Sequence, residues 1–462
     1  MIADLKPYSE YQQPGLPWAE RVPAHWKLRR TKVLFSQRVQ KGFPDEPLLA
    51  ATQSQGVVKK SDYGERTVTA TKDLHLLKLV EPGDFVISLR SFQGGLEIAH
   101  CRGIISPAYT ILKPRDEVRR GYFKRFFKSP DFIDSLTLFV TGIREGQNID
   151  YERLSRVYLP VPPPDEQEAI GRFLDHWNGR LEKAIRSKRR VIALLQEQKQ
   201  AIIHRAVTRG LDPNVKLKDS GIPWLGDVPK HWEVRPLKFL CRRIQNGATP
   251  PSSEQQYYEN GSVPWFGPSS VGAGSDLGAP VRHLNKAAFT EGKARLINGP
   301  AILVIVIGAT AGKMGLLIGE GATNQQITSF ELKEDSVVPQ FVIQQMRSSE
   351  KWLKSTASTA TIPILDSGVV NRLPVAFPPC SEQELILSSL SQQIEPLVAA
   401  ITRYEREITL LREYRTRLTA DVVTGKLDVR AAAAQLPEEA EDEPLPDPEL
   451  PEEETELEEV EG

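Results

Sequence analysis

The chain has 462 residues, 40% of them hydrophobic, so two or three globular domains with ordinary cores are expected. Its 59 basic and 60 acidic residues nearly balance, but 14 of the acidic residues lie in segment 437–462, which has no basic residue. Residues 1–436 therefore hold 59 basic against 46 acidic residues, a net charge of +13. A moderately basic body favours a polyanionic partner, and segment 431–462 is predicted to be an acidic disordered tail.

The cysteines and apolar runs argue against several classes of protein. Cys101, Cys241 and Cys380 are isolated, so neither a disulfide framework nor a zinc cluster is indicated, and no metal site is predicted. Residues 1–10 lack the basic start and apolar run of a signal peptide. The longest apolar run, 301–318, is interrupted by glycines and a lysine, which favours strand–turn–strand over a membrane span. We expect a cytoplasmic protein.

Two parts of the chain repeat in the same order. Segments 15–35 and 221–241 are identical at ten of 21 positions, and both contain the sequence V-P-x-H-W. Segments 163–168 (PPDEQE) and 379–384 (PCSEQE) each lead into a long helical pattern. A repeat of more than about 200 residues is too long for a solenoid unit. The sequence therefore predicts two homologous modules in tandem.

Each module is followed by a helical segment with a heptad seam. Seam residues recur at alternating spacings of four and three, and adding 216 to each number gives the seam of the second helix. The predicted seam residues are Leu181, Ile185, Ile192, Leu195, Ile202, Leu397, Ile401, Ile408, Leu411 and Leu418. A 3.5-residue period is typical of coiled coils, so we expect the two helices to pack antiparallel on each other as a rigid spacer. The alternative is that each helix packs only on its own module.

The regions between the repeated ends are predicted to be rich in β-structure. Segments 85–90, 109–113, 302–306 and 327–332 are short and β-branched or aromatic. Short helices are expected at 122–128 and 339–354. The predicted fold class is α+β: two tandem β-rich domains separated by two long antiparallel coiled-coil helices, with a pseudo-twofold internal repeat. The predicted boundaries are 1–160 for the first β-rich domain, 161–214 for the first spacer helix, 215–375 for the second β-rich domain, 376–430 for the second spacer helix and 431–462 for the tail.

The sequence indicates no catalytic constellation. Segment 308–313 has three residues between its glycines, where a phosphate loop has four, and Met314 stands where that loop needs Ser or Thr. A Gly-rich β-turn is therefore favoured. His25 and His231 recur within V-P-x-H-W without a repeated Asp or Cys partner. A structural histidine beside a buried tryptophan is favoured over a catalytic one, and no Gly-rich adenosylmethionine loop is present.

The repeated features resemble the specificity subunits of type I restriction–modification enzymes. The resemblance spans nearly the whole chain except the acidic tail, and the order and duplication of its segments carry it. These segments are 90–96 (RSFQGGL) with 103–109, 141–148 leading to 159–167, 308–315 (GATAGKMG) with 323–326, and 373–383. The tail and the V-P-x-H-W openings depart from the family pattern, and we interpret the openings as a structural clasp.

The resemblance implies a DNA-reading scaffold that is not an enzyme. Each β-rich domain would be a target recognition domain that reads one half of a split sequence in double-stranded DNA. The helix pair would set the unread spacer and bind two modification subunits, which methylate adenine, and restriction subunits driven by ATP would join them. Adenosylmethionine, ATP and magnesium are expected on those partners, and no cofactor is expected on this chain. Phage defence is the biological role that the family implies.

Base edges are read by polar side chains on loops, so the DNA-contacting residues are predicted on the loops that differ between the modules. The candidates are Arg90, Gln93, Arg144, Gln147, Asn148, Thr310, Lys313, Asn324, Gln325, Thr359 and Thr361. The alternative for each residue is turn geometry and solubility. Two other functions stay open: a specificity subunit of a system with fused cleavage and methylation subunits, and a non-specific DNA-bridging coiled-coil protein. The second alternative predicts similar loops in both modules, and segments 90–95 and 308–313 differ.

Overall fold

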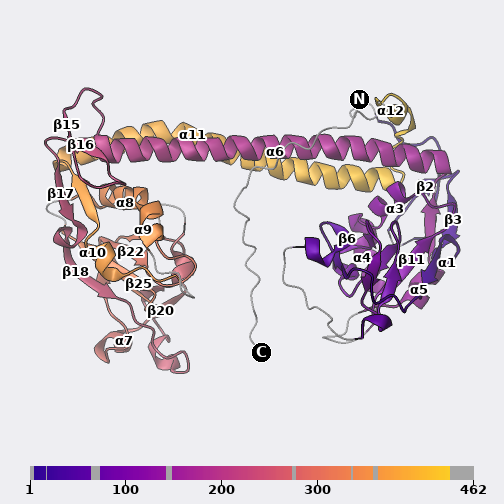
Figure 1. Cartoon of the computed structure of the whole chain (residues 1–462), viewed down its shortest axis with the longest axis horizontal. Helices are drawn as coiled ribbons and strands as arrows, with labels where there is room; N and C mark the ends of the chain where they lie inside the picture. Colours follow the sequence, from indigo (N-terminus) through magenta and orange to yellow (C-terminus); the bar gives the residue numbers. More distant parts are fainter. Residues whose placement is uncertain are drawn as a thin grey trace. The chain divides into compact units, whose positions relative to one another are not determined.

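The computed structural model describes residues 5–16, 18–63, 73–141, 148–272, 277–333, 337–356 and 363–437 (Figure 1). Its contacts form two compact units: unit 1 comprises Met1–Arg190 and Glu405–Gly462, and unit 2 comprises Val191–Tyr404. Both long helices contribute to both units, so unit 1 is made of two separate stretches of chain and unit 2 of one. In the part of the chain that the structure describes, no helix is both long and apolar enough to span a membrane.

The centre of unit 1 is an antiparallel sheet with the strand order β4–β11–β8–β9. These strands are β4 (Phe35–Arg38), β11 (Thr110–Pro114), β8 (Phe85–Ile87) and β9 (Glu97–Ile98). One face is covered by α3 (Arg120–Phe126) and α4 (Pro130–Leu136). Phe35 and Phe85 meet edge to face with ring centroids 5.7 Å apart, and Phe35 meets Phe123 of α3 at 5.4 Å. Aromatic packing of this kind fixes the helices on the sheet.

Unit 2 contains the same sheet, with the order β18–β25–β22–β23. These strands are β18 (Cys241–Asn246), β25 (Ile327–Leu332), β22 (Ala301–Ile305) and β23 (Met314–Leu317). Since β22 and β23 are joined by a turn, the predicted strand–turn–strand structure of segment 301–318 is confirmed. A second sheet in unit 2 has the order β20–β19–β24–β21. Its strands are β20 (Arg282–Leu284), β19 (Val263–Phe266), β24 (Glu320–Thr323) and β21 (Ile297–Asn298).

Smaller strand pairs also repeat between the units. In each unit the strand after V-P-x-H-W pairs with the strand that leads into the long helix, and the V-P dipeptide pairs with a strand before it. The pairs in unit 1 are β3 (Lys27–Arg30) with β14 (Tyr158–Val161) and β1 (Tyr11–Gln12) with β2 (Val22–Pro23). Those in unit 2 are β17 (Glu233–Pro236) with β26 (Pro374–Phe377) and β15 (Leu217–Asp219) with β16 (Asp227–Pro229). The hairpin β5 (Leu49–Thr52)–β6 (Gly56–Lys59) and the pair β7 (Lys78–Val80)–β10 (Gly103–Ile105) belong to unit 1.

The predicted spacer helices are α6 (Pro164–Arg209) and α11 (Cys380–Val423). All ten predicted seam residues are buried or half-buried. In unit 1 the two helices are joined by ion pairs, Glu182 with Arg415 at 2.7 Å and Lys188 with Glu407. In unit 2 buried residues of both helices share one apolar cluster, which includes Ile203, Ala206, Ile386 and Leu390. In unit 1, ascending numbers in α6 meet descending numbers in α11, so the two helices lie side by side and run antiparallel there (Figure 1).

The short helices differ in detail from the prediction. The helix expected at 122–128 is α3, which begins at Arg120 and ends at Phe126. The helix expected at 339–354 is two helices, α8 (Pro339–Ser348) and α9 (Glu350–Thr356). The break falls at Ser349, whose hydroxyl donates to the Met346 carbonyl at 2.6 Å. Serine side chains compete with the helical backbone in this way, and the sequence pattern did not reveal it. The other α-helices of the described residues are α1 (Thr31–Leu34), α2 (Ser91–Gly94), α5 (Tyr151–Arg156), α7 (Lys286–Thr290), α10 (Ser367–Asn371) and α12 (Arg430–Ala434).

Candidate nucleic-acid interface

The turn between β8 and β9 carries the first predicted contact residues. It contains the short helix α2 (Ser91–Gly94). The Ser91 hydroxyl accepts a hydrogen bond from the Ser88 amide at 2.8 Å, which closes the entrance of the turn. Arg90 and Gln93 are exposed, and within the described residues neither side chain has a recorded partner. Both side chains lie on the exposed surface of the turn.

Gly95 ends this turn in a conformation that only glycine adopts readily. Its φ is +77°, and a Cβ at this position would lie 2.0 Å from the Phe127 carbonyl oxygen. A residue with a side chain would have both a strained backbone and a collision with main chain. The turn is thus seated directly on the end of the helical layer.

The turn between β22 and β23 occupies the same place in unit 2. Gly308 and Gly312 have φ values of +111° and +92°, so they act as turn glycines, and the β-turn interpretation of this segment is confirmed. Thr310 and Lys313 are half-buried on it. Within the described residues neither side chain has a recorded partner. The turn and its unit 1 counterpart have the same position in the sheet and different sequences.

Two neighbouring segments flank the unit 2 turn. The Val306 amide donates to the Gln326 carbonyl at 2.8 Å, and the Gly308 amide donates to the Pro363 carbonyl at 3.0 Å. Asn324 is buried, and its side chain donates to the Gln326 side chain at 2.8 Å. Gln325 is exposed and contacts Thr249. The structure therefore brings the four described unit 2 candidates to the same end of the central sheet, and it gives Asn324 a role in shaping the turn.

The other predicted contact residues lie outside the described residues or at their edge. Arg144, Gln147, Thr359 and Thr361 lie outside the described residues. Asn148 is known by its backbone alone: it begins β13 (Asn148–Ile149), which pairs with β12 (Val140–Thr141). α2 lies against β13, so Asn148 is near the turn that carries Arg90 and Gln93. DNA contact by all these residues stays a prediction.

The repeated V-P-x-H-W and P-x-x-E-Q sequences meet in unit 1. One carboxylate, that of Glu166 at the start of α6, accepts three hydrogen bonds from groups far away in sequence. The Tyr8 hydroxyl donates at 2.6 Å and the Trp26 indole at 2.8 Å to Oε1, while His25 Nε2 lies 2.7 Å from Oε2. Glu166 and Trp26 are buried, so these charge-assisted bonds form away from solvent. We call these four residues the first clasp.

The second clasp repeats this arrangement in unit 2. Trp232 donates its indole N–H to Glu382 Oε1 at 3.1 Å, and His231 Nε2 lies 2.9 Å from Oε2. The structural interpretation of both histidines agrees with this geometry. The partner of each histidine is a repeated Glu, and not the repeated Asp or Cys that the sequence lacks.

The Gln of each P-x-x-E-Q sequence ties the long helix to the helical layer. In unit 1 the Gln167 side chain accepts from the Arg119 amide at 2.9 Å and donates to the Pro162 carbonyl at 2.9 Å. In unit 2 Gln383 accepts from the Val338 amide and donates to the Pro378 carbonyl, both at 2.8 Å. Arg119 and Val338 precede α3 and α8, so these bonds satisfy amides at two helix starts.

Each unit also holds the carboxyl end of a long helix. The Tyr122 hydroxyl donates to the Val423 carbonyl of α11 at 2.9 Å in unit 1. The Gln345 side chain donates to the Val207 carbonyl of α6 at 2.6 Å in unit 2. Val207 and Val423 are 216 residues apart and begin the repeated V-T segments. Each unit therefore binds the start of one long helix and the end of the other.

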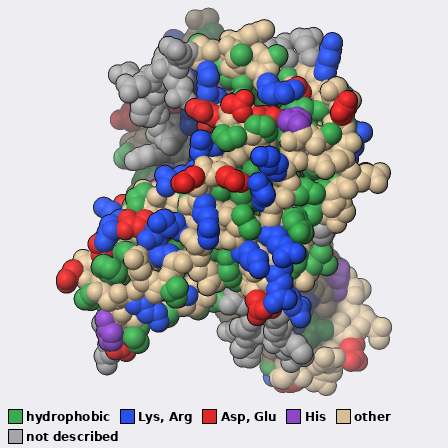
Figure 2. All heavy atoms as spheres, turned by 90° about the vertical axis from the view of Figure 1, so that its right-hand side faces the viewer, with side chains coloured by type: hydrophobic (Ala, Val, Ile, Leu, Met, Phe, Trp, Pro, Cys, Tyr) green, Lys and Arg blue, Asp and Glu red, His purple; other side chains and the backbone are tan. Residues whose placement is uncertain are grey.

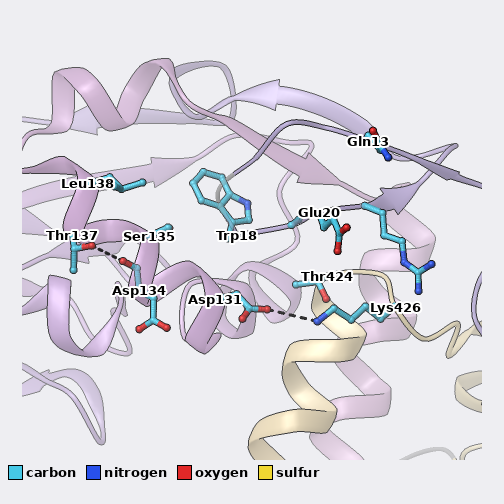
Figure 3. Close-up of a pocket in the computed structure, with 12 residues that line it drawn as sticks. Gln13, Trp18, Glu20, Asp131, Asp134, Ser135, Thr137, Leu138, Thr424 and Lys426 are labelled. Atoms are coloured by element: carbon cyan, nitrogen blue, oxygen red, sulfur yellow. Dashed lines mark hydrogen bonds and ion pairs between the residues drawn. The ribbon is translucent and has the colours of Figure 1, made fainter.

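A cavity of about 810 Å³ lies beside the end of α11 in unit 1 (Figure 3). Trp18 lines it and packs edge to face on Phe132, with ring centroids 5.4 Å apart. Asp131 on α4 lies 3.8 Å from the Lys426 ammonium, just beyond α11. Among the described residues no group of three His, Cys, Asp or Glu side chains is placed to hold a metal ion. We therefore interpret the residues that line this cavity as those that hold the end of α11 on unit 1.

Figure 2 shows Lys and Arg side chains gathered on the face of unit 1 near β3 and α5. Two arginines of α5 are paired: Arg153 lies 3.5 Å from Asp150, and Arg156 contacts Glu152. The guanidinium of Arg30 lies over the Tyr158 ring at 5.3 Å. Ion pairs therefore offset part of the positive charge on this face.

Comparisons with known proteins agree with a duplicated recognition scaffold. Residues 229–410 match the family model described as type I restriction modification DNA specificity domain. The type I restriction enzyme MjaIX specificity subunit of Methanocaldococcus jannaschii is 21% identical over 386 residues, which is 79% of this chain and 83% of that protein. The MjaVIII specificity subunit of the same organism is 25% identical over 338 residues, 71% of this chain and 75% of that protein.

A solved structure has the same fold. It is described as concerning complex assembly and conformational transition of the type I R-M system; it covers 88% of this chain with a TM-score of 0.61 and 16% identity. The class defined by fold and site is a pair of related recognition domains joined by long helices. Over most of its length the chain is similar to specificity subunits of type I restriction–modification systems, and residues 229–410 match the model of their DNA specificity domain.

Proposed function

We propose that this chain reads a bipartite sequence in double-stranded DNA and positions the subunits that modify and cleave it. Each β-rich module would read one half of the target. The long helices would bind two modification subunits that methylate adenine, and restriction subunits would join them. Adenosylmethionine, ATP and magnesium would bind those partners, and this chain would be the non-catalytic subunit of a cytoplasmic enzyme.

The observation that carries this proposal is the pair of turns at one place on a repeated sheet. Segments 88–96 and 306–313 follow corresponding strands, β8 and β22, yet present Arg90 and Gln93 in one case and Thr310 and Lys313 in the other. Matching scaffolds with different exposed side chains are expected when two domains read different sequences. A non-specific bridging protein would instead present similar surfaces twice.

The test is to map adenine methylation in cells that carry this chain with its modification subunit, and then to change one turn. Arg90→Ala with Gln93→Ala should weaken discrimination at one half-site only. Loss of one bidentate base contact costs about 1–3 kcal/mol, or roughly 5–150-fold in affinity. Thr310→Ala with Lys313→Ala is the matched variant and should affect the other half-site. Absence of any bipartite methylated sequence, or changes confined to the wrong half-site, would refute the assignment.

A further inference from the structure

A lysine and an arginine occupy matched positions behind the two turns. The bonds of Gln167 and Gln383 place Arg119 and Val338 at the same point of the two units. Nine residues further along stand Lys128 and Arg347. Both are half-buried, and both follow or lie on the helix that covers the central sheet.

In unit 1 the Lys128 ammonium holds the end of the turn. It donates to the Gly94 carbonyl at 2.7 Å and to the Gln53 carbonyl at 3.3 Å, and it forms an ion pair with Glu97. Glu97 is buried on β9, and burial raises the pKa of its carboxyl group. One cation therefore joins the turn, the β5–β6 hairpin and the central sheet.

In unit 2 Arg347 makes the corresponding contact. Its guanidinium donates to the Met314 carbonyl at 3.0 Å. Met314 directly follows Lys313, as Gly94 directly follows Gln93. In both units, then, a cation from the covering helical layer binds the carbonyl next to the last candidate contact residue of the turn. The sequences of the two turns differ, but this bond is made twice.

We propose that Lys128 and Arg347 are positioning residues that fix the two recognition turns, each for one half-site. This inference rests on the proposed function. A hydrogen bond from a charged donor to a backbone carbonyl sets the turn's height and tilt without touching the DNA. Base readout by Arg90 or Lys313 depends on side chains held within a few tenths of an ångström of their productive place. We expect Lys128 and Arg347 to affect the discrimination between DNA sequences. Other basic residues would supply the electrostatic attraction to the DNA phosphates.

The experiment uses the complex with the modification subunit and DNA duplexes that carry the sequence methylated by the wild type. Matched duplexes have one base pair changed in one half-site. The variants are Arg347→Met, Arg347→Lys, Glu97→Gln and the double variant Lys128→Met with Glu97→Gln. The double variant avoids an uncompensated buried carboxylate, which would destabilise the fold. Binding is measured with matched and changed duplexes, and melting temperature is measured for every variant.

Lys128→Met with Glu97→Gln should lower discrimination at the first half-site by about tenfold relative to Glu97→Gln, and leave the second half-site unchanged. Arg347→Met should do the reverse, and Arg347→Lys should restore most of the loss. Non-specific binding should change little. Unchanged discrimination in folded variants, or an equal loss at both half-sites, would overturn the positioning role. If the wild-type complex showed no sequence preference, the proposed function itself would fail.

Discussion

The two clasps are built from the same residues and differ in how far solvent reaches them. The Glu166 side chain is 2% exposed and accepts from Tyr8, Trp26 and His25. Glu382 is 31% exposed and has two of these partners, Trp232 and His231. The repeated sequence therefore reproduces the hydrogen bonds without reproducing their surroundings.

The chain segments that cover each clasp account for the difference. In unit 1 the residues before β1 reach the end of α11, where the Asp428 amide donates to the Lys6 carbonyl at 2.9 Å. Arg430 lies over the Tyr8 ring at 5.1 Å. In unit 2 the corresponding segment is the link between α6 and β15. β15 begins 206 residues after β1, and at this offset the counterpart of Tyr8 is Asn214. The same bond should therefore contribute more stability in unit 1, because water cannot replace a lost partner there.

The largest expected effect is that of Glu166→Ala. It leaves the buried donors of Tyr8 and Trp26 without an acceptor, so we expect a loss of about 3–5 kcal/mol in the free energy of unfolding. Glu382→Ala, the matched control, should lose only about 1–2 kcal/mol, because water reaches that site. Urea unfolding followed by circular dichroism measures both values. Equal losses would show that burial does not separate the two clasps.

The glycines after the long helices give a second test. Gly425 and Gly210 both have positive φ, +77° and +72°, and both lie against the clasp tryptophans. A Cβ on Gly425 would lie 2.3 Å from Pro23 Cδ, whereas a Cβ on Gly210 would meet Trp232 at 3.4 Å. Gly425→Ala should cost about 2–4 kcal/mol, from backbone strain and overpacking together, and Gly210→Ala about 1 kcal/mol. Melting temperatures of the two variants compare them directly, and a larger loss for Gly210→Ala would contradict this packing.

Most of the fold could be predicted from patterns among residues that are close together in the sequence. The heptad spacing of Leu181 and Ile185 reports a helix surface, and the apolar run at 301–305 reports a buried strand. The clasp could also have been predicted, since His25 and Glu166 belong to motifs that both recur, but 141 residues separate them. The role of Lys128 could not be predicted. Its partners in the turn and in the β5–β6 hairpin are backbone carbonyls, which any residue type supplies.

The smallest expected effect concerns Tyr8, the residue that distinguishes the clasps. Tyr8→Phe removes one hydrogen bond to a buried carboxylate and should cost about 1–2 kcal/mol at neutral pH. Asn214→Ala, at the matched position in unit 2, should cost less than about 0.5 kcal/mol. A loss that is equal in the two variants would contradict a specific role for the phenol.

The pH dependence of the Tyr8 effect tests its cause. Burial first, and then the hydrogen bond to Glu166, raise the pKa of the Tyr8 phenol above its ordinary value of 10.0. Above pH 10 the unfolded chain loses this proton while the folded chain keeps it, so the folded state binds more protons and stability falls as pH rises. Tyr8→Phe lacks this contribution, so its deficit relative to the wild type should shrink steadily above pH 10. Urea unfolding of both proteins at pH 8, 10 and 11 measures the difference. A deficit that stayed constant would mean that the phenol titrates normally and that the first clasp is open to solvent like the second.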